Sequence, residues 1–192
     1  MTYHTHLVGA LAFAAAFAAG RPLPAAAVLL AAAAVAAPRP DLDHPGSTYG
    51  RFVPLPRVAR RDGAVVPYRR GGRSVGHVGF RLPCGILWHR GPLHSLTAGF
   101  AAVALATEAG LHWWPAYASV LALGVAIAWL SHLLLDGLTV AGQAWLWPFT
   151  ARKFRLPGWH IRVGTWGETA VLVTCGLGLR WAGHGLIARL PF

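Results

Sequence analysis

The feature that most constrains this chain is an apolar run from Trp113 to Leu135 that contains no Asp, Glu, Lys or Arg. An α-helix needs about 20 apolar residues to cross the hydrocarbon core of a bilayer, and this run is long enough. Four further apolar runs occur in the chain, at Leu7–Ala19, Leu23–Ala37, Leu93–Ala109 and Thr169–Ala182. The sequence therefore predicts an all-α, polytopic helical membrane protein.

The number of membrane helices follows from the lengths of these runs. The first two are short, rich in alanine and separated by Arg21-Pro22, so two spans and one re-entrant hairpin are both compatible with them. The last run is also short. We expect five membrane helices, with three as the lower bound, in a single membrane-embedded domain of residues 1–192. The segment Met1–His6 lacks the Lys or Arg of a signal peptide, so we expect residues 1–20 to be retained.

The composition supports a membrane environment. Only 12% of the residues are charged and 55% are hydrophobic, whereas a soluble domain carries about 25% charged residues. The mean hydropathy is +0.48. The two cysteines, Cys84 and Cys175, are far apart and form no Cys-x-x-Cys pair. We therefore expect neither a disulfide framework nor a cysteine-based zinc site.

The distribution of positive charge predicts the orientation in the membrane. The net charge is +11, and 14 of the 17 Lys and Arg residues lie in two segments, Arg39–Arg90 and Arg152–Arg162. The turn Glu108–Trp113 contains none. Because loops rich in Lys and Arg stay in the cytoplasm, we expect the N-terminus and both basic segments to be cytoplasmic and the C-terminus to be outside.

Within the first basic segment, residues 45–83 are rich in Pro, Gly and Arg and show no sustained helical period. They are predicted to form a long, Arg-rich cytoplasmic loop, with room for short elements of its own. Its charge serves either topology alone or contact with anionic lipid, at about 1 kcal/mol per basic residue. A basic chain can also bind nucleic acid. These charges are confined to loops between apolar runs, so we expect no specific nucleic-acid partner. No oligomeric state is predicted.

The stretch Pro40-Asp-Leu-Asp-His-Pro45 follows the second apolar run. Its prolines disfavour a helix, and an extended backbone would place Asp41 and Asp43 on the same side. His44 would then point the other way unless the loop turns. Two carboxylates and an imidazole suit zinc, manganese or iron. The alternative is a turn that ends a helix and carries solvated acids.

Two pairs of ligand-type residues flank the third and fourth runs. In the first pair, His94 is expected in the first turn of a helix capped by Gly91, and His89 in the preceding loop, so the two can converge. In the second pair, His132 and Asp136 share one helix face because they are four residues apart. A carboxylate in a membrane helix costs free energy and so indicates function. The alternatives are interfacial histidines and a His–Asp hydrogen bond that only joins helices.

The predicted orientation places all of these residues at the cytoplasmic ends of helices. We therefore predict one site that holds one or two divalent ions, with zinc favoured over manganese or iron. The predicted ligands are His6, Asp41, Asp43, His44, His89, His94, His132 and Asp136. Glu168 is a candidate ligand or base, or only a helix-dipole partner, and Arg90 is a candidate to hold a phosphate oxygen or only a topological charge. Four histidines lack acidic partners and are excluded: His77, His112, His160 and His184.

Three ordered motifs resemble a known family. They are Pro40-Asp-Leu-Asp-His-Pro-Gly-Ser47, His89-Arg-Gly-Pro-Leu-His-Ser95 and Ser131-His-Leu-Leu-Leu-Asp-Gly-Leu-Thr139. The chain resembles the YdjM-like proteins, described as LexA-regulated, inner-membrane metal-dependent hydrolases. Leu93 departs from the family, which often has Thr there. The resemblance implies an inner-membrane location and a hydrolase. Its His and Asp pattern is similar to that of zinc-dependent phospholipase C and P1 nuclease, which cleave phosphate esters.

We therefore expect a metal-dependent hydrolase at the cytoplasmic membrane interface, acting on a phosphate ester or on membrane lipid. The alternatives are a transporter or metal-ion carrier, and a structural membrane protein whose site only joins helices. A transporter site usually lies near the bilayer midplane, whereas these residues gather at one edge. The chain contains no His-Glu-x-x-His and no Gly-x-Ser-x-Gly, which disfavours a zincin protease and a serine lipase.

Overall fold

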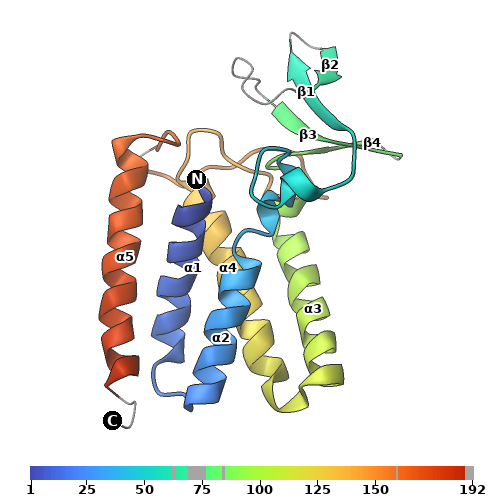
Figure 1. Ribbon diagram of the computed structural model, residues 1–192. Coiled ribbons are helices and arrows are strands. Elements are labelled where there is room, and N and C mark those ends of the chain that lie inside the picture. Colours follow the sequence, from blue (N-terminus) through green and yellow to red (C-terminus); the bar gives the residue numbers. More distant parts are fainter. Residues whose placement is uncertain (62–63, 69–76, 84, 159, 189–192) are drawn as a thin grey trace.

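The computed structural model describes residues 1–61, 64–68, 77–83, 85–158 and 160–188. Five helices stand side by side (Figure 1). They are α1 (Tyr3–Ala18), α2 (Leu23–Ala36), α3 (Leu96–Trp113), α4 (Ala118–Gly137) and α5 (Trp166–Ile187). Each helix coincides with one predicted apolar run. Helix α4 is central because it packs on α1, α2 and α3, while α5 packs on α1.

Small side chains let α1, α2 and α4 approach closely. Ala10, Ala14, Ala33 and Ala128 are fully buried in the core between these helices. A Cβ atom added at Gly124 of α4 would lie 2.6 Å from the Ala32 Cβ atom and 2.7 Å from a backbone oxygen of α2. Close contact through small residues is how membrane helices associate, because burial in lipid brings no hydrophobic gain.

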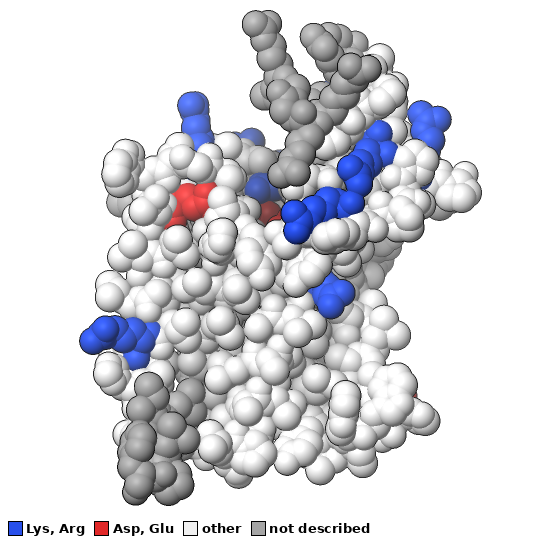
Figure 2. Space-filling view, viewed as in Figure 1, with Lys and Arg blue, Asp and Glu red and all other residues white. Residues whose placement is uncertain are grey.

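Large apolar side chains point outward from the bundle. Phe100 and Leu105 of α3 and Leu177 and Trp181 of α5 are all more than half exposed. On the face shown in Figure 2, the Lys and Arg side chains drawn in blue gather mainly at the end near the N-terminus, and the surface over the helices carries few charges. This outer surface is suited to lipid rather than to water.

Two helical stretches of the described chain are long and apolar enough to cross a membrane by length and composition. They are Leu23–Asp43, with 21 residues and a mean hydropathy of 1.5, and Pro115–Gly137, with 23 residues and a mean hydropathy of 2.0. The other three helices lie alongside without meeting that criterion. The expected count of five membrane spans therefore stays a prediction.

The all-α class is corrected by a small sheet. Its strands are β1 (Arg57–Arg61), β2 (Ala64–Pro67), β3 (His77–Leu82) and β4 (Gly85–Trp88), antiparallel in the order β2-β1-β3-β4. The sheet lies at the same end of the bundle as the N-terminus (Figure 1).

Most of this sheet lies within residues 45–83, where we expected a long loop with at most short elements of its own. Val58 of β1 and Val78 and Phe80 of β3 are buried, and they stand among Gly and Arg residues. A Cβ atom at Gly79 would lie 2.1 Å from the Leu87 carbonyl oxygen, so glycine is needed where β3 meets β4. Such short strands are stabilised by pairing across the sheet, which a search for helical period does not detect.

Candidate metal centre

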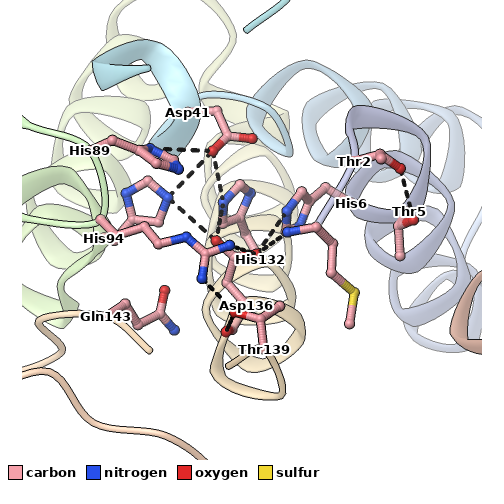
Figure 3. A network of polar contacts seen from close by, with 12 residues as sticks. Thr2, Thr5, His6, Asp41, His89, His94, His132, Asp136, Thr139 and Gln143 are labelled. Carbon is pink, nitrogen blue, oxygen red and sulfur yellow. Dashed lines mark hydrogen bonds and ion pairs between the residues drawn. The ribbon is translucent and has the colours of Figure 1, made fainter. Parts of the chain in front are cut away.

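The predicted ligand-type side chains come from four separate parts of the chain and meet at the sheet end of the bundle (Figure 3). His6 lies in the first turns of α1, and His132 and Asp136 lie in the last turns of α4. Asp41 and Asp43 belong to a short 3₁₀ helix, η1 (Pro40–Asp43). His89 follows β4, and His94 ends a second 3₁₀ helix, η3 (Pro92–His94).

The extended backbone expected at Asp41 and Asp43 is wrong. Proline is tolerated in the first helical turn, and the Leu42 and His44 amides donate to the Arg39 and Asp41 carbonyls at 3.1 and 3.0 Å. In a 3₁₀ helix, which has three residues per turn, side chains two positions apart diverge by roughly 120°. The two carboxylates therefore face different partners.

The expected helix start at Gly91 is also corrected. Pro92 belongs to η3, and the N-cap of α3 is Ser95, whose Oγ accepts a hydrogen bond from the Ala98 amide at 3.1 Å. His94 is thus held just before the helix and is fully buried. The preceding turn contains Arg90 with a φ of 62°, a left-handed conformation that costs a non-glycine residue about 1–2 kcal/mol.

Asp41, His94, His132 and Asp136 form what we call the ligand cluster, in which one ligand atom from each lies within 4.8 Å of the others. His94 Nε2 lies 3.4 Å from Asp41 Oδ1 and 3.6 Å from Asp136 Oδ2. The corresponding distances from His132 Nε2 are 3.7 and 3.9 Å. Ligands of a tetrahedral zinc ion with bonds of about 2.1 Å lie roughly 3.4 Å apart. The spacing of the ligand cluster therefore fits a single ion.

Polar atoms in the ligand cluster are buried without hydrogen-bond partners among the described residues. They are His94 Nε2, His132 Nε2 and Asp136 Oδ2. The other ring nitrogens are occupied, since His94 Nδ1 lies 3.1 Å from Asp43 Oδ2 and His132 Nδ1 lies 2.8 Å from the Ala37 carbonyl oxygen. When both Nδ1 atoms donate, both Nε2 atoms present lone pairs. A bound cation would satisfy these groups, which are costly to bury alone.

Asp43 orients two histidines. Its Oδ1 lies 2.8 Å from His89 Nδ1, and its Oδ2 faces His94. Asp43, His89 and His94 are also close enough to hold an ion. His94 Nδ1, however, is engaged with the carboxylate, so the geometry gives Asp43 the place of the outer acceptor that fixes a metal-binding imidazole.

The pKa values of the histidines that lie outside helices α1 to α5 are shifted in different directions by burial and by neighbouring charges. Burial disfavours the charged form of His94, but Asp43 and Asp41 outweigh it and raise the pKa of His94 to about 10. Burial and the neighbouring His89 lower the pKa of His44 to about 4. Burial also lowers the pKa of His89, against the opposing effect of Asp43. Without an ion, a proton is therefore held on His94, between the carboxylates.

Positive and aromatic groups surround the second oxygen of Asp136. Asp136 Oδ1 lies 3.2 Å from Arg90 Nη2 and 3.3 Å from His6 Nε2, and it also contacts the Met1 amino group. The His6 ring stacks on that of His132 with centroids 3.6 Å apart. His6 thus lies beside the ligand cluster rather than within it. Arg90 is buried and also donates to the Thr139 hydroxyl.

Like His6, the predicted residues His44 and Glu168 lie outside both groups that could hold an ion. His44 Nδ1 accepts a hydrogen bond from the Gly46 amide at 3.0 Å, and its ring contacts His89 edge-on. Glu168 accepts hydrogen bonds from the Thr5 hydroxyl at 2.9 Å and the Gly164 amide at 2.7 Å. Oε1 therefore ties α5 to α1 and Oε2 accepts from the turn before α5, so both oxygens of Glu168 are engaged away from the ligand cluster.

A cavity of about 410 Å³ borders the ligand cluster. Its walls include Asp41, His44, Tyr49, His89 and Arg90. Asp41 is 16% exposed, whereas the other three members of the ligand cluster are at most 1% exposed. A molecule in this cavity, which we call the polar cavity, would therefore meet the ligand cluster at Asp41.

Sequence reasoning missed several supporting groups. Gln143 is fully buried and donates from Nε2 to the Leu133 carbonyl at the end of α4. The Thr139 hydroxyl donates a hydrogen bond to the Asp136 carbonyl at 2.7 Å and accepts one from Arg90 Nη1. Thr139 is the last residue of the Ser131–Thr139 motif, so its place in that motif could have indicated a role at the site. Nothing in its local pattern marks Gln143.

The known proteins that resemble this chain are inner membrane proteins. Residues 1–190 match the family model described as YdjM inner membrane protein. The chain is 35% identical over 80 residues to the inner membrane protein YbcI of Escherichia coli (strain K12). That match covers 41% of this chain and 46% of YbcI, so it spans about half of the relative's length. No solved structure matches the chain. The chain belongs to the YdjM family of inner membrane proteins.

Proposed function

We propose that this protein is a membrane-bound, metal-dependent hydrolase that cleaves a phosphate ester at the cytoplasmic interface of the inner membrane. One observation carries the proposal. Buried, unpartnered ligand atoms of His94, His132 and Asp136 face Asp41, and Asp41 opens to the polar cavity. A site that is buried on one side and accessible on the other is suited to binding both an ion and a substrate.

The ligand cluster would hold the ion. Two carboxylates and two imidazoles suit zinc first and also manganese or iron. The bound ion would lower the pKa of a water molecule and polarise a phosphoryl oxygen. Asp43 and the Ala37 carbonyl keep His94 and His132 in the tautomer that presents Nε2. The geometry supports one ion rather than two, because His94 directs only one nitrogen away from Asp43.

Two residues of the polar cavity have roles toward the substrate. His89 is bonded to Asp43 and is 19% exposed, so its imidazole is placed to transfer a proton to or from a group in the cavity. Arg90 lines the same wall and keeps positive charge there while it is paired with Asp136. An anionic phosphate is favoured by that charge.

Two other functions use the same residues. An ion carrier would place its site near the middle of the bundle, whereas these residues lie at the helix ends (Figure 1). A structural zinc site has all four positions filled by protein. The ligand cluster also offers four groups, so catalysis would need a further position for water, and that position would open beside Asp41, which lines the polar cavity. The depth and the cavity both favour the hydrolase.

The test measures bound metal and phosphate-ester hydrolysis on the same purified samples. Asp136→Asn should lose both while the protein stays in the membrane, because the variant removes a ligand charge and not a helix. Glu108→Gln is the matched control, since Glu108 is an exposed carboxylate in the distal half of α3. Wild-type protein that binds no metal under metal-replete conditions would refute the proposal. Metal without hydrolysis of any phosphomonoester or phosphodiester would support the structural role instead.

A further inference from the structure

An apolar groove runs along the outside of the bundle between α2 and α3. Its volume is about 730 Å³. Helices α2 and α3 both pack on α4, and α4 forms the floor between them (Figure 1). The lining includes Val28, Ala31 and Val35 of α2, Ala102 of α3, and Leu121 and Val125 of α4.

The groove exists because the facing side chains are small. Helix α2 has the sequence LPAAAVLLAAAAVA, and its groove side is mostly alanine. On α3 the groove is lined by Ala102. Neither helix carries a side chain that reaches across to fill the space. A bundle in a bilayer must cover such a surface with another apolar molecule or with lipid.

The two ends of the groove differ chemically. Arg39 lies at the end nearest the ligand cluster, and Trp114 and Tyr117 lie at the other end. From Val28 to Arg39 the helical rise of 1.5 Å per residue gives a length of about 16 Å. One leaflet of the hydrocarbon core is about 15 Å thick, half of 30 Å. The groove is therefore as long as one acyl chain of one leaflet and has a cation at its interfacial end.

Arg39 connects the groove to the polar cavity. Its guanidinium lies over the Tyr49 ring, with Cζ 5.6 Å from the centroid, and Tyr49 lines the polar cavity. Arg39 Nε donates to the Val35 carbonyl at 3.2 Å. Its terminal amino groups form no hydrogen bond with any residue that the structure describes, and the side chain is exposed. A planar guanidinium with free donors suits an anionic phosphate.

We infer that the substrate is a membrane phospholipid, whose acyl chain lies in the α2–α3 groove while Arg39 holds its phosphate at the entrance to the polar cavity. This inference rests on the proposed function and adds the substrate class to it. In the hydrolysis itself, water adds to phosphorus, the phosphorus–oxygen bond to the leaving alcohol breaks, and that alcohol takes up a proton. No further reactant is needed.

The first experiment measures binding without hydrolysis. Protein is purified in mild detergent, and the phosphatidylglycerol that stays bound is measured by native mass spectrometry. Ala31→Phe and Ala102→Phe place a ring in the groove and should lose the bound lipid. Val173→Phe is the matched control, because Val173 is 55% exposed on α5, away from the groove. Arg39→Gln should weaken retention about fivefold, which is the loss of about 1 kcal/mol for one basic residue near lipid phosphate.

The second experiment separates this inference from the proposed function. The groove variants should slow hydrolysis of long-chain phospholipid about tenfold or more, since a small misfit in an apolar pocket has this effect. They should leave hydrolysis of a water-soluble phosphate ester and the melting temperature unchanged. Equal lipid retention by wild type and both groove variants would overturn the inference even if the protein is a hydrolase. So would a second copy of the chain in place of lipid in the mass spectra.

Discussion

Two regions of this bundle are equally buried but differ in chemistry, since one is apolar and the other contains polar atoms without hydrogen-bond partners among the described residues. Between α1, α2 and α4 the buried core cluster consists of aliphatic side chains, mostly alanine, such as Ala14, Leu29 and Ala128. One or two turns away, His94, His132 and Asp136 are just as buried but have ring nitrogens and a carboxylate oxygen without partners. The first region is complete as it folds, and the second is complete only with a cation.

The largest expected effect comes from removing a ligand. His94→Ala should reduce bound metal and hydrolysis to background, because the variant removes the histidine that lies nearer to both carboxylates of the ligand cluster. Metal analysis and an ester-hydrolysis assay check this. His112→Ala is the control, since His112 lies in the last turn of α3, at the end of that helix farthest from the site. Full metal content in the His94 variant would show that the comparison between the two regions is mistaken.

A smaller effect is expected from the group that orients the ligands. Asp43→Asn should weaken metal affinity by about 10–100-fold, which is the usual range when an acceptor behind a metal-binding histidine is removed. Metal should still bind at high concentration, because the ligand cluster itself is intact. A titration with a competing chelator measures the affinity. Loss of all binding would show instead that Asp43 is itself a ligand, as the sequence predicted.

The apolar region should respond in stability and not in metal binding. Gly124→Ala is expected to destabilise the protein by about 1–3 kcal/mol, because the added methyl group meets the backbone of α2. Gly178→Ala is the control on α5, where an added Cβ atom meets nothing within 4 Å. Thermal unfolding in detergent measures both variants. Unchanged metal stoichiometry in Gly124→Ala would sharpen the contrast, and its loss would show that the regions are coupled.

The smallest expected effect is the change in metal affinity for each pH unit. The pKa of His94 is raised to about 10, so below that pH the free site holds a proton that metal must displace. Affinity should therefore rise with pH, by about tenfold per pH unit for one proton, between pH 7 and 9. The lowered pKa values of His44 and His89 mean that neither has a proton to release in that range. Calorimetry in two buffers counts the released protons, and a value near zero would contradict this prediction.

Much of the fold could be predicted because it depends on local pattern. The apolar run ending at Leu135 lies within two residues of the end of α4, and the spacing of His132 and Asp136 placed both on one helix face. The sheet was missed because its strands are four to six residues long and are defined by pairing, such as Val58 with Gly79. Such short paired strands produce neither a helical repeat nor a long alternation of apolar and polar residues in the sequence.

The sequence indicated which residues lie near one another at the candidate site better than it indicated their backbone conformations and hydrogen-bond partners. Sequence alone indicated that Asp41 and Asp43 lie near the histidines, but it could not choose the 3₁₀ turn that separates their roles. That choice depends on partners more than 40 positions away, namely His89 and His94. Glu168 was left open as a ligand, a base or only a helix-dipole partner. Its Oε1 accepts from Thr5 of α1 and its Oε2 from Gly164, and the position of a Glu at a helix N-terminus does not indicate which of these partners it will find.

The acceptor behind His132 is a main-chain atom, and this has a consequence for genetics. The Ala37 carbonyl is one of those that the end of α2 leaves free, and His132 Nδ1 takes it up at 2.8 Å. Every amino acid has that carbonyl, so exchanging the residue at position 37 leaves the bond in place. Ala37 is fully buried, so a scan of side-chain substitutions at this position would report on packing in the core and not on the hydrogen bond to His132. Of the two acceptors that orient the ligand histidines, a substitution scan would therefore detect Asp43 behind His94 but not the backbone carbonyl behind His132.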